Sequence, residues 1–365
     1  MKIVYLISNI RKCGPLNVMN QIIYNMKNDD ISVISIFGDR DNHEIIGDYK
    51  KNGIKVYSLN LNKKNYILKG KKQLKKIIEE INPDVINSHG IIPDLLICNL
   101  QKFYRVSTIH SNIYEDYLNR FGKIKGIIFI KLHEKALKKI DKKIAVSKFI
   151  SEKLIQKGIK SNYIRNGVEI EKIDNINDIK KDVKKELKVP ENSIMYVFCG
   201  SLYTAKGVKE LVEMFNHSHE ENEYLIIMGN GPERESIEKI KDDHVKMLGH
   251  TKNVIRYYAA ADIYISNSKT EGFSMAMLEA LNAENLLLLS DIPSHRECMD
   301  IDKNIYLGEI YNKDNFEEKK EKVKKSIGKF DKRIIPKISA KRMADEYKKI
   351  YKIKRKDDEK WKKLL

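Results

Sequence analysis

Two glutamates stand eight residues apart in the stretch SNSKTEGFSMAMLEAL, which spans residues 266–281. Eight residues of straight helix rise about 12 Å, so two carboxylates at that separation cannot share a proton. Glu271 precedes a Gly-Phe-Ser turn, whereas Glu279 lies in the apolar run that follows, and this run predicts a helix. One carboxylate before a helix and another inside it could bind two ends of the same ligand.

The turn between the two glutamates predicts an anion site. Ser274 is placed to cap the helix, and the free amide groups of a first helical turn attract negative charge. We expect a diphosphate here, with Glu271 and Glu279 on either side of it. Glu279 could instead cap or face solvent, but the residues around it are apolar, and a carboxylate among them needs a partner to offset its burial.

Three other loops place glycine at the start of an expected helix. In FCGSLYTAKG, Gly200 ends an apolar run and Lys206 directly precedes a helix, where a cation and helix amides together favour phosphate. In GNGPERESI, Gly229 and Gly231 lack the spacing of a dinucleotide or Walker loop. In RKCGPLNV, Gly14 could let the backbone approach a ligand closely. Taken alone, the Gly14 loop is a weak signal and a Lys-Gly pair is usually an ordinary solvated turn.

The elements that would position these residues follow an alternating pattern. Short β-branched runs alternate with longer amphipathic stretches, which predicts parallel sheets covered by helices. The expected strands are 2–8, 31–38, 55–60, 84–90, 105–110, 142–147, 193–202, 223–231, 244–250, 262–268 and 285–291. The expected helices include 16–26, 74–81, 208–218 and 232–240. Ligands of such sheets bind at the carboxyl ends of strands, where the candidate residues fall.

The chain length of 365 residues predicts two domains. The stretch 171–193 is charged and poor in large aromatic residues, so the boundary is expected there, between a domain at 1–168 and another at 169–339. The N-terminal stretch MKIVYLISNI is apolar but short, and we interpret it as a first buried strand rather than a signal peptide. After about residue 336, the sequence predicts one long basic helix.

The net charge of +18 leaves three interpretations open. It could follow from a general preference for lysine along the chain, or from attraction to an anionic membrane or substrate. Binding of nucleic acid is not expected, because no concentrated basic face or reading motif is present in the sequence. No apolar run approaches the roughly 18 residues that span a bilayer. The four cysteines lack metal-ligand spacing, which favours a reducing cytoplasm without zinc or disulfides.

Taken in order, the motifs GSLYTAKG, IIMGNGP, VKMLGH and SNSKTEGFSMAMLEAL resemble the retaining glycosyltransferases of family four. Weaker similarity extends through STIHS, IAVSKFISEKL and YIRNGVE, so the resemblance runs over most of the chain. It implies the α/β fold class called GT-B, in which two Rossmann-like, doubly wound parallel-sheet domains face each other across a cleft. The C-terminal helix, 340–365, is then expected to cross back to the first domain.

The resemblance also implies roles for matching positions. Glu271 would contact hydroxyl groups of a donor sugar, and Glu279 would contact the ribose of the nucleotide. Lys206 would hold the diphosphate together with backbone amides near Phe273 and Ser274, and would stabilise the charge that develops on this leaving group.

His110 would lie near the sugar and the reacting centre, and the loop of Gly14 would close over the phosphates. The other donor contacts implied by the motifs are Gly200, Ser201, Gly229, Gly231, Gly249 and Gly272. Such enzymes need no metal, and none is expected here; the nucleotide-sugar is a co-substrate and no cofactor is expected.

The sequence departs from the family pattern in three places. Ser201 stands where an arginine commonly joins the lysine on the diphosphate. Glu284 and Asn285 occupy a turn where glycine is usual, and Cys13 and Pro15 flank a single glycine in place of a double-glycine loop. These departures concern the identity of the donor and the catalytic strength rather than the fold.

The expected function is transfer of a hexose, with retention, from a nucleotide-diphosphate sugar to a glycan or lipid-linked acceptor. UDP is expected in preference to GDP, and the pathway is expected to build a bacterial surface polysaccharide such as capsule, exopolysaccharide or lipopolysaccharide. A nucleotide-sugar epimerase of the same fold is one alternative, which donor conversion without an acceptor would distinguish. A non-catalytic nucleotide-sugar-binding scaffold is another, and its support is Ser201.

Two lysine-rich stretches of the first domain also contain many apolar residues, at 63–78 and 121–143. Read as helices, they could present a basic and apolar face to anionic lipid, which would place a cytoplasmic protein on the inner face of a membrane. The alternative is that their apolar sides pack on the sheet while the lysines face water.

Overall fold

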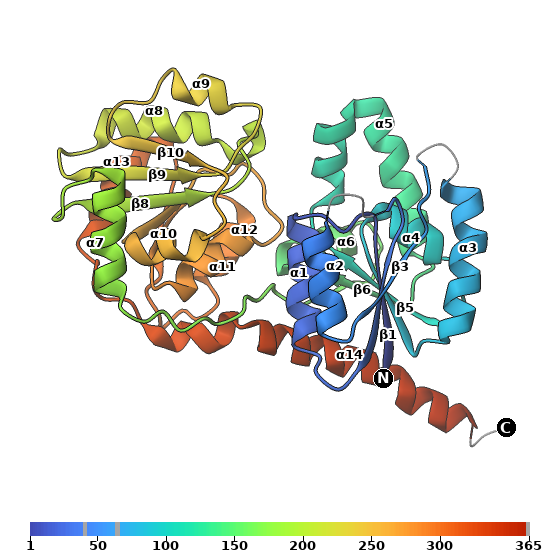
Figure 1. Cartoon of the computed structure of the whole chain (residues 1–365). Helices are drawn as coiled ribbons and strands as arrows, with labels where there is room; N and C mark the ends of the chain where they lie inside the picture. Colours follow the sequence, from blue (N-terminus) through green and yellow to red (C-terminus); the bar gives the residue numbers. More distant parts are fainter. Residues whose placement is uncertain (39–41, 63–65, 363–365) are drawn as a thin grey trace. The chain divides into compact units, whose positions relative to one another are not determined.

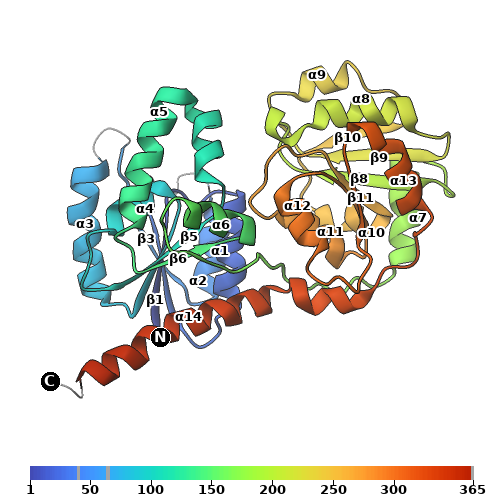
Figure 2. The same ribbon diagram turned by 180° about the vertical axis from the view of Figure 1, so that it is seen from behind.

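The computed structural model describes residues 1–38, 42–62 and 66–362, without the side chains of residues 66–68 and 353–362. The chain forms two compact units. Unit 1 comprises Met1–Gly167 with Ala340–Leu365, and unit 2 comprises Val168–Ser339. Each unit is a parallel sheet between layers of helices (Figures 1 and 2). The expected doubly wound α/β fold is therefore confirmed for both halves.

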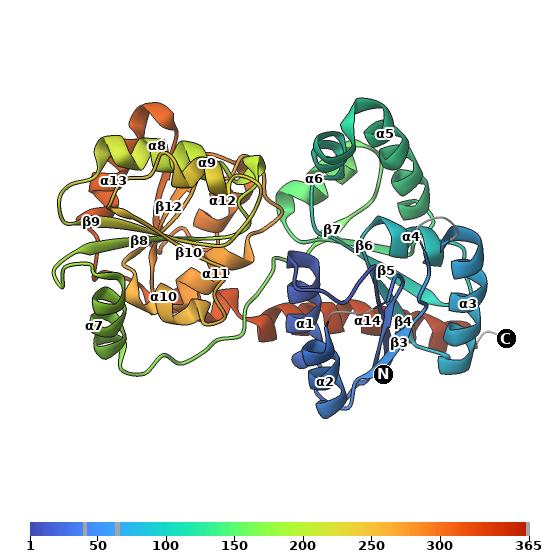
Figure 3. The ribbon, with the colours of Figure 1, turned by 45° about the horizontal axis from the view of Figure 1, so that its top comes forward.

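Unit 1 is built on a seven-stranded parallel sheet of order β3-β2-β1-β4-β5-β6-β7. Its strands are β1 (Lys2–Ile7), β2 (Asp30–Ser35), β3 (Lys55–Ser58), β4 (Val85–His89), β5 (Tyr104–Ile109), β6 (Lys142–Ala145) and β7 (Asn162–Tyr163). Its helices are α1 (Gly14–Tyr24), α2 (His43–Lys51), α3 (Tyr66–Ile81), α4 (Ile91–Ile97), α5 (Ile113–Leu137), α6 (Lys148–Gln156) and α14 (Ala340–Lys362). Figure 3 shows α1 and α14 on one side of this sheet, with α4 and α5 on the other.

Helix α14 completes the core of unit 1 although it comes from the end of the chain. Its residues Tyr347 and Tyr351 are buried. The hydroxyl of Tyr351 accepts a hydrogen bond of 2.6 Å from Nδ2 of Asn87 on β4, and the hydroxyl of Tyr347 lies 3.2 Å from Oγ1 of Thr108 on β5. Because a buried polar group without a partner is costly, α14 is needed to satisfy the polar residues of these central strands.

Unit 2 is built on a six-stranded parallel sheet of order β10-β9-β8-β11-β12-β13. Its strands are β8 (Ile194–Cys199), β9 (Glu223–Met228), β10 (Val245–Gly249), β11 (Ile263–Ser266), β12 (Leu286–Ser290) and β13 (Gly308–Tyr311). Its α-helices are α7 (Ile176–Leu187), α8 (Val208–Ser218), α9 (Arg234–Glu238), α10 (Val254–Ala260), α11 (Met275–Asn282), α12 (Pro293–Met299) and α13 (Phe316–Lys324). Three short 3-10 helices are η1 (Thr204–Lys206), η2 (Lys313–Asn315) and η3 (Lys332–Ile338).

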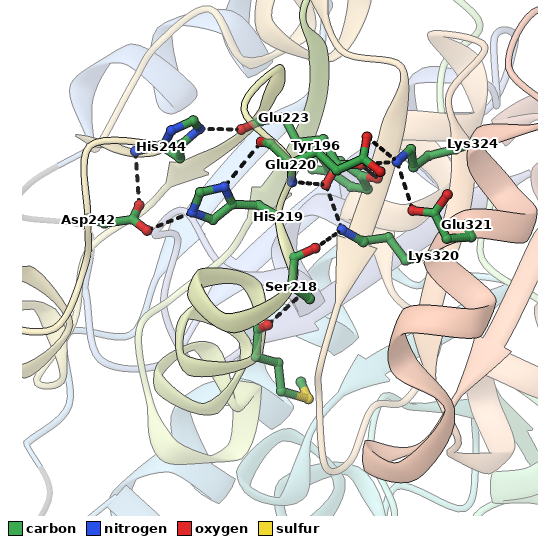
Figure 4. Close-up of polar contacts among 11 residues, drawn as sticks. Tyr196, Ser218, His219, Glu220, Glu223, Asp242, His244, Lys320, Glu321 and Lys324 are labelled. Atoms are coloured by element: carbon green, nitrogen blue, oxygen red, sulfur yellow. Dashed lines mark hydrogen bonds and ion pairs between the residues drawn. The ribbon is translucent and has the colours of Figure 1, made fainter.

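A buried ion cluster fastens α13 to the start of β9 in unit 2 (Figure 4). The Glu223 carboxylate is fully buried and accepts from Lys320 at 2.6 Å and pairs with Lys324 at 2.7 Å. Burial alone would raise the pKa of Glu223, but hydrogen bonds from the two lysines hold it below its usual value. Glu223 begins β9, so this cluster lies at the amino ends of the strands. The candidate site lies at the opposite, carboxyl ends, and the cluster is therefore separate from it.

The expected strands agree with observed strands to within a few residues, and two short strands, β7 and β13, were not predicted. The polar stretch 171–193, where the boundary was expected, contains helix α7 of unit 2. Its buried Val183 marks the side that packs, and α7 contacts α10. Within the described residues, no helix is both long enough and apolar enough to cross a membrane.

Candidate functional site

The main polar cluster of unit 2 joins two loops at the carboxyl ends of its strands. The amine of Lys206, at the end of η1, forms an ion pair with the carboxylate of Glu271, which precedes α11. The hydroxyl of Ser268 donates to the same Glu271 oxygen at 2.9 Å. The structure therefore brings together two of the residues that the sequence singled out, although 65 positions separate them.

The loop after η1 is fixed by a close backbone contact. Gly207 has a φ of +60°, and a Cβ there would lie 2.3 Å from the carbonyl oxygen of Asn267. The amide Nδ2 of Asn267 donates to the carbonyl of Gly207 at 3.0 Å. Because only glycine fits this contact, the Lys-Gly pair in the sequence holds Lys206 against the loop of Glu271.

The electrostatics of Glu271 are set by two opposing effects. Burial acts to raise the pKa of this carboxyl, but the charge and hydrogen bond of Lys206, with Ser268, lower it below its usual value. Glu271 is consequently ionised at neutral pH, and its charge is balanced by Lys206. Both side chains keep some exposure, 13% for Glu271 and 26% for Lys206, so a ligand can reach them.

Two residues that sequence reasoning missed support this cluster. The Ser290 hydroxyl, at the end of β12, donates to the carbonyl of Ser268 at 2.7 Å. Nδ1 of His295 lies 2.8 Å from the Ser290 carbonyl, which assigns it as the donor of that bond. Burial lowers the pKa of His295, although Glu271 acts in the opposite direction. The signal available in the sequence was position, because Ser290 is the penultimate residue of the predicted strand 285–291 and His295 lies four residues after that strand.

Helix α11 holds the second glutamate. The predicted N-cap is confirmed, because the Ser274 side chain accepts from the backbone amide of Met277 at 3.5 Å. Glu271 precedes this helix and Glu279 lies inside it, as the sequence predicts. Burial raises the pKa of Glu279, and Glu171 adds to that increase while Tyr258 opposes it. The two carboxyls are therefore in different electrostatic settings: the cation Lys206 lowers the pKa of Glu271, whereas burial raises that of Glu279.

The glycines of the β8 and β9 loops bring these loops together. A Cβ on Gly229 would lie 1.8 Å from the carbonyl oxygen of Gly200, and one on Gly231 would lie 2.5 Å from that of Leu202. Gly249, with a φ of +69°, would bring a Cβ within 2.8 Å of the Arg234 guanidinium. These contacts explain the glycines through packing of one loop against another. Their assignment to a donor stays a prediction.

The remaining predicted donor contacts of unit 2 differ in exposure. Ser201 is exposed at the end of β8, Gly272 is half-buried, and Phe273 is buried. Phe273 therefore anchors the turn between Glu271 and Ser274, while Ser201 leaves its position without a cationic side chain.

In unit 1, two histidines meet at the ends of neighbouring strands. His89 ends β4 and His110 follows β5, and Nδ1 of His89 lies 2.9 Å from Nε2 of His110. Burial lowers the pKa of His110 to about 3, and burial together with His110 lowers that of His89 well below its usual value. Both imidazoles are thus neutral at pH 7. Sequence reasoning singled out His110 but not His89, which occupies the matching strand end in NSHG.

The histidine pair borders a cavity of about 530 Å³ within unit 1. Arg11 and Arg120 contribute cations to its lining, Asp116 contributes a carboxylate, and much of the rest is apolar or aromatic. Gly14 is exposed nearby at the start of α1, and a Cβ there would meet no atom within 4 Å. Internal packing therefore gives no reason for glycine at this position.

The described residues contain no group of three or more His, Cys, Asp or Glu side chains placed to hold a metal ion. Their chemistry is instead that of hydrogen bonding and fixed charge. Unit 2 offers an ion pair, the N-terminus of α11 and a half-buried carboxyl, which suit a ligand with phosphate and hydroxyl groups. Unit 1 offers a neutral imidazole beside a cavity of mixed character.

Comparison with known proteins gives consistent matches. A family model described as "Glycosyltransferase Family 4" matches residues 25–172, and one described as "Glycosyl transferases group 1" matches residues 179–342. The O-antigen biosynthesis glycosyltransferase WclY of Escherichia coli is 25% identical over 311 residues, which cover 82% of this chain and 83% of WclY. The capsular polysaccharide biosynthesis glycosyltransferase CapH of Staphylococcus aureus is 25% identical over 320 residues, covering 81% and 83%.

Among solved structures, HepE of Anabaena in complex with UDP-glucose has a TM-score of 0.72 to this chain at 16% identity. The match covers 95% of both chains. At this identity the likeness concerns the fold, and it agrees with the two parallel-sheet units described above.

Proposed function

The chain belongs to the glycosyltransferases that these two family models describe, and from this premise we propose that it transfers a hexose from a nucleotide-diphosphate sugar with retention. UDP is the proposed carrier in preference to GDP, because UDP-glucose is bound by HepE, which has the same fold. The proposed acceptor is a glycan or a lipid-linked glycan of a bacterial surface polysaccharide. The names of WclY and CapH, which refer to O-antigen and capsule, support that assignment.

The observation that carries the proposal is the ion pair between Lys206 and Glu271 directly before α11. A donor diphosphate would compete with Glu271 for the Lys206 amine and would also meet the free amides at the start of α11. Glu271, once released, is an acceptor for the hydroxyl groups of the sugar. A single pair of side chains therefore positions both the phosphate and the sugar ends of the donor.

The same groups supply transition-state stabilisation. Negative charge grows on the diphosphate as the bond to the sugar breaks. Lys206 and the α11 amides would stabilise that charge from the positions that they already hold around the bound donor. Glu279 is proposed to bind the ribose, because its raised pKa and its place inside the helix suit a hydrogen bond to a neutral hydroxyl.

Unit 1 is proposed to bind the acceptor. His110 is neutral, so it can exchange hydrogen bonds with sugar hydroxyls without adding charge to the reacting centre. The nearby cavity combines arginines with aromatic side chains, which suits an acceptor with both anionic and apolar parts. Of the two lysine-rich stretches, 121–143 is the proposed contact to an anionic membrane. In the other, 63–78, residues 63–65 lie outside the described residues, and Leu74 and Ile78 are buried in unit 1.

A non-catalytic scaffold is the second candidate, because Ser201 provides no cation beside Lys206. The first experiment is a thermal-shift screen against UDP, GDP, ADP and their common sugar conjugates. At a hundred times Kd, a ligand stabilises the folded protein by about 2.7 kcal/mol. We expect a shift with UDP or UDP-sugars that is reduced in Lys206→Met. Absence of a shift with every nucleotide, in a folded sample, would reject the proposal.

Binding alone does not separate transfer from scaffolding or from epimerisation. The second experiment therefore follows the donor that gives the shift, with and without membrane extracts that contain acceptors. Transfer requires acceptor-dependent consumption of the donor, and retention requires that the new glycosidic bond keep the donor's anomeric configuration by NMR. Consumption without any acceptor indicates epimerisation or hydrolysis, and bound but unconsumed donor indicates a scaffold.

A further inference from the structure

Helix α5 of unit 1 is a hairpin of two helical arms. Gly122 has a φ of +75° and interrupts the helix between the arms. A Cβ on Gly126 would lie 2.7 Å from the carbonyl oxygen of Tyr117, so glycine is needed where the arms approach each other. Figure 1 shows the hairpin standing above the sheet of unit 1. The element is thus built to project, with one face toward the unit and another away from it.

The inner face of the hairpin lines the cavity that borders His110. The rings of Phe121 and Phe129, one from each arm, lie 4.7 Å apart and both line the cavity. The Tyr117 hydroxyl lies 2.8 Å from Nδ1 of His133, whose Nε2 is 2.7 Å from the buried carboxylate of Asp94. These contacts fix the inner face to the core of unit 1.

The outer face of the hairpin is apolar and exposed. Ile124 is 79% exposed, Ile128 is 53% exposed and Ile127 is 47% exposed, and Leu118 and Leu132 are also exposed. Single exposed apolar residues are ordinary on protein surfaces, but five on one short hairpin form a concentrated group.

The charge of this face has one sign. Lys123, Lys125 and Lys131 are exposed, and the sequence from 117 to 133 contains no acidic residue, while Arg120 lines the cavity. Exposed isoleucines among lysines are the composition of a face that inserts shallowly into a lipid interface, where the lysines reach anionic headgroups. Two copies of this face would bring like charges together, which opposes self-association through it.

Helix α3 provides an internal comparison, because the sequence presented both stretches as equal candidates. In α3, Leu74 and Ile78 are fully buried, while Lys75 and Lys76 are exposed. Its apolar side therefore packs into unit 1, and the exposed side chains of its described part are polar or charged: Lys69, Lys72, Gln73, Lys75, Lys76, Glu79 and Glu80. In α5 the apolar residues themselves are at the surface, so the two stretches differ in their capacity to enter a lipid interface.

We propose that the outer face of the α5 hairpin, defined by Leu118, Ile124, Ile127, Ile128 and Leu132 with its lysines, docks on an anionic lipid bilayer. Because the inner face of the same hairpin lines the cavity, docking places that cavity beside the headgroups. The acceptor class that fits this arrangement is a glycan carried on a lipid phosphate or diphosphate, and this last step rests on the proposed function. The cavity's arginines would face the phosphate groups.

The test measures co-sedimentation of the full chain with vesicles of phosphatidylcholine alone, or with about one third phosphatidylglycerol. The docking variant is Ile124→Ser/Ile127→Ser/Ile128→Ser, and the charge variant is Lys123→Gln/Lys125→Gln/Lys131→Gln. All six side chains are exposed, so the fold should tolerate both changes.

Matched controls change the same residue types elsewhere in unit 1. Ile155→Ser removes an isoleucine that is 54% exposed on α6, and Lys75→Gln/Lys76→Gln removes exposed lysines from α3. We expect the chain to bind the anionic vesicles, the docking variant to lose about tenfold or more in affinity, and the controls to remain within about twofold. The charge variant should weaken binding and reduce its dependence on salt.

Equal binding by the docking variant and the unaltered chain would overturn the proposal, as would absence of binding to anionic vesicles. A change in sedimentation velocity without lipid, seen only in the docking variant, would also overturn it by assigning the face to a protein interface.

Nucleotide-sugar thermal shifts keep the two proposals apart. If the docking variant binds vesicles poorly but binds the donor normally, the lipid inference stands on its own. If the unaltered chain binds vesicles but no donor, the proposed transfer fails and lipid docking survives.

Discussion

Units 1 and 2 each place a pair of polar side chains at the carboxyl ends of their strands, and the two pairs have opposite electrostatic character. In unit 1, His89 and His110 contact each other and both are neutral. In unit 2, Lys206 and Glu271 contact each other and carry opposite charges. Burial opposes ionisation in both places, and only in unit 2 does a counter-ion outweigh it.

The difference separates the two tasks of the proposed transfer. A charged pair can exchange partners with a charged ligand, so the pair in unit 2 is suited to a diphosphate. A neutral pair has no charge to compensate, so the pair in unit 1 is suited to hydroxyl groups near a centre that develops positive charge. Substitutions in either pair, Lys206 with Glu271 or His89 with His110, should therefore have different effects.

The largest effect is expected from Glu271→Gln. This change keeps the size of the side chain and its hydrogen bond from Ser268, but it removes the charge proposed to bind the sugar hydroxyls. Transfer should fall by about two to three orders of magnitude. The matched control is Glu210→Gln, which breaks the exposed ion pair of Glu210 with Lys269 in the same unit and should leave the rate within about threefold. Equal losses in both variants would remove Glu271 from the mechanism.

Lys206→Met should change stability in a way that depends on pH. It leaves Glu271 buried without its counter-ion, so the pKa of Glu271 should rise and the variant should lose about 1–2 kcal/mol near pH 8 and less near pH 5. In the unaltered chain the pH dependence has the opposite sign, because Lys206 lowers the pKa of Glu271. Glu271 then contributes to the free energy of unfolding at pH values above its unfolded pKa, and this contribution is lost as the pH falls through its folded pKa. Urea unfolding at the two pH values measures the difference.

The double variant Lys206→Met/Glu271→Gln is the control for that prediction. It carries no charge at either position, so it should be more stable near pH 8 than Lys206→Met alone. If the double variant is no more stable near pH 8 than Lys206→Met alone, an unpaired charge on Glu271 is not what destabilises the single variant.

The neutral pair predicts a different pH dependence in unit 1. Because burial lowers the pKa of His89 and His110, unfolded chains bind protons more readily, and stability should fall as the pH drops from about 6.5 toward 3. His89→Gln/His110→Gln should flatten this slope in urea unfolding, whereas His217→Gln, on the surface of α8, should not. A slope unchanged by the double variant would show that the pair is not held neutral.

The smallest effect is expected from Ser201→Arg. Ser201 is exposed, so an arginine fits without repacking and adds a second cation near Lys206. We expect a gain of a few-fold in kcat/KM, with an unchanged melting temperature, because one partly solvated charge contributes about 1 kcal/mol or less. A loss of activity would indicate that the donor binding mode excludes an arginine here.

The sequence was sufficient to predict the strands other than the short β7 and β13, the two-unit organisation and the start of α11. These features depend on local patterns: β-branched runs made buried strands, and Ser274 before an apolar run made a capped helix. Lys206 and Glu271 were found because each lies in a loop shortly before a helix, and Glu279 was found because it is the one charged residue of an apolar helix. The resemblance added roles to these positions, and those roles stay predictions.

The contacts between distant loops could not be predicted in the same way. The pairing of His89 with His110 depends on the order of β4 and β5 in the sheet. The support of Ser268 by Ser290, which His295 contacts in turn, depends on the neighbouring loop. Whether apolar residues of a lysine-rich stretch face the core or the solvent depends on Gly122 and on packing of the arms, so the sequence left α3 and α5 equal. Long-range packing decided each case.

The return of α14 to unit 1 has a consequence for synthesis on the ribosome. The partners of Asn87 and Thr108 are Tyr351 and Tyr347, which are translated only after all of unit 2. At about 5–20 residues per second, roughly 10–30 s pass between completion of residue 167 and emergence of α14. The domain that is translated first is therefore the last to be finished, and a nascent chain halted within unit 2 leaves the central strands of unit 1 open to chaperones and proteases.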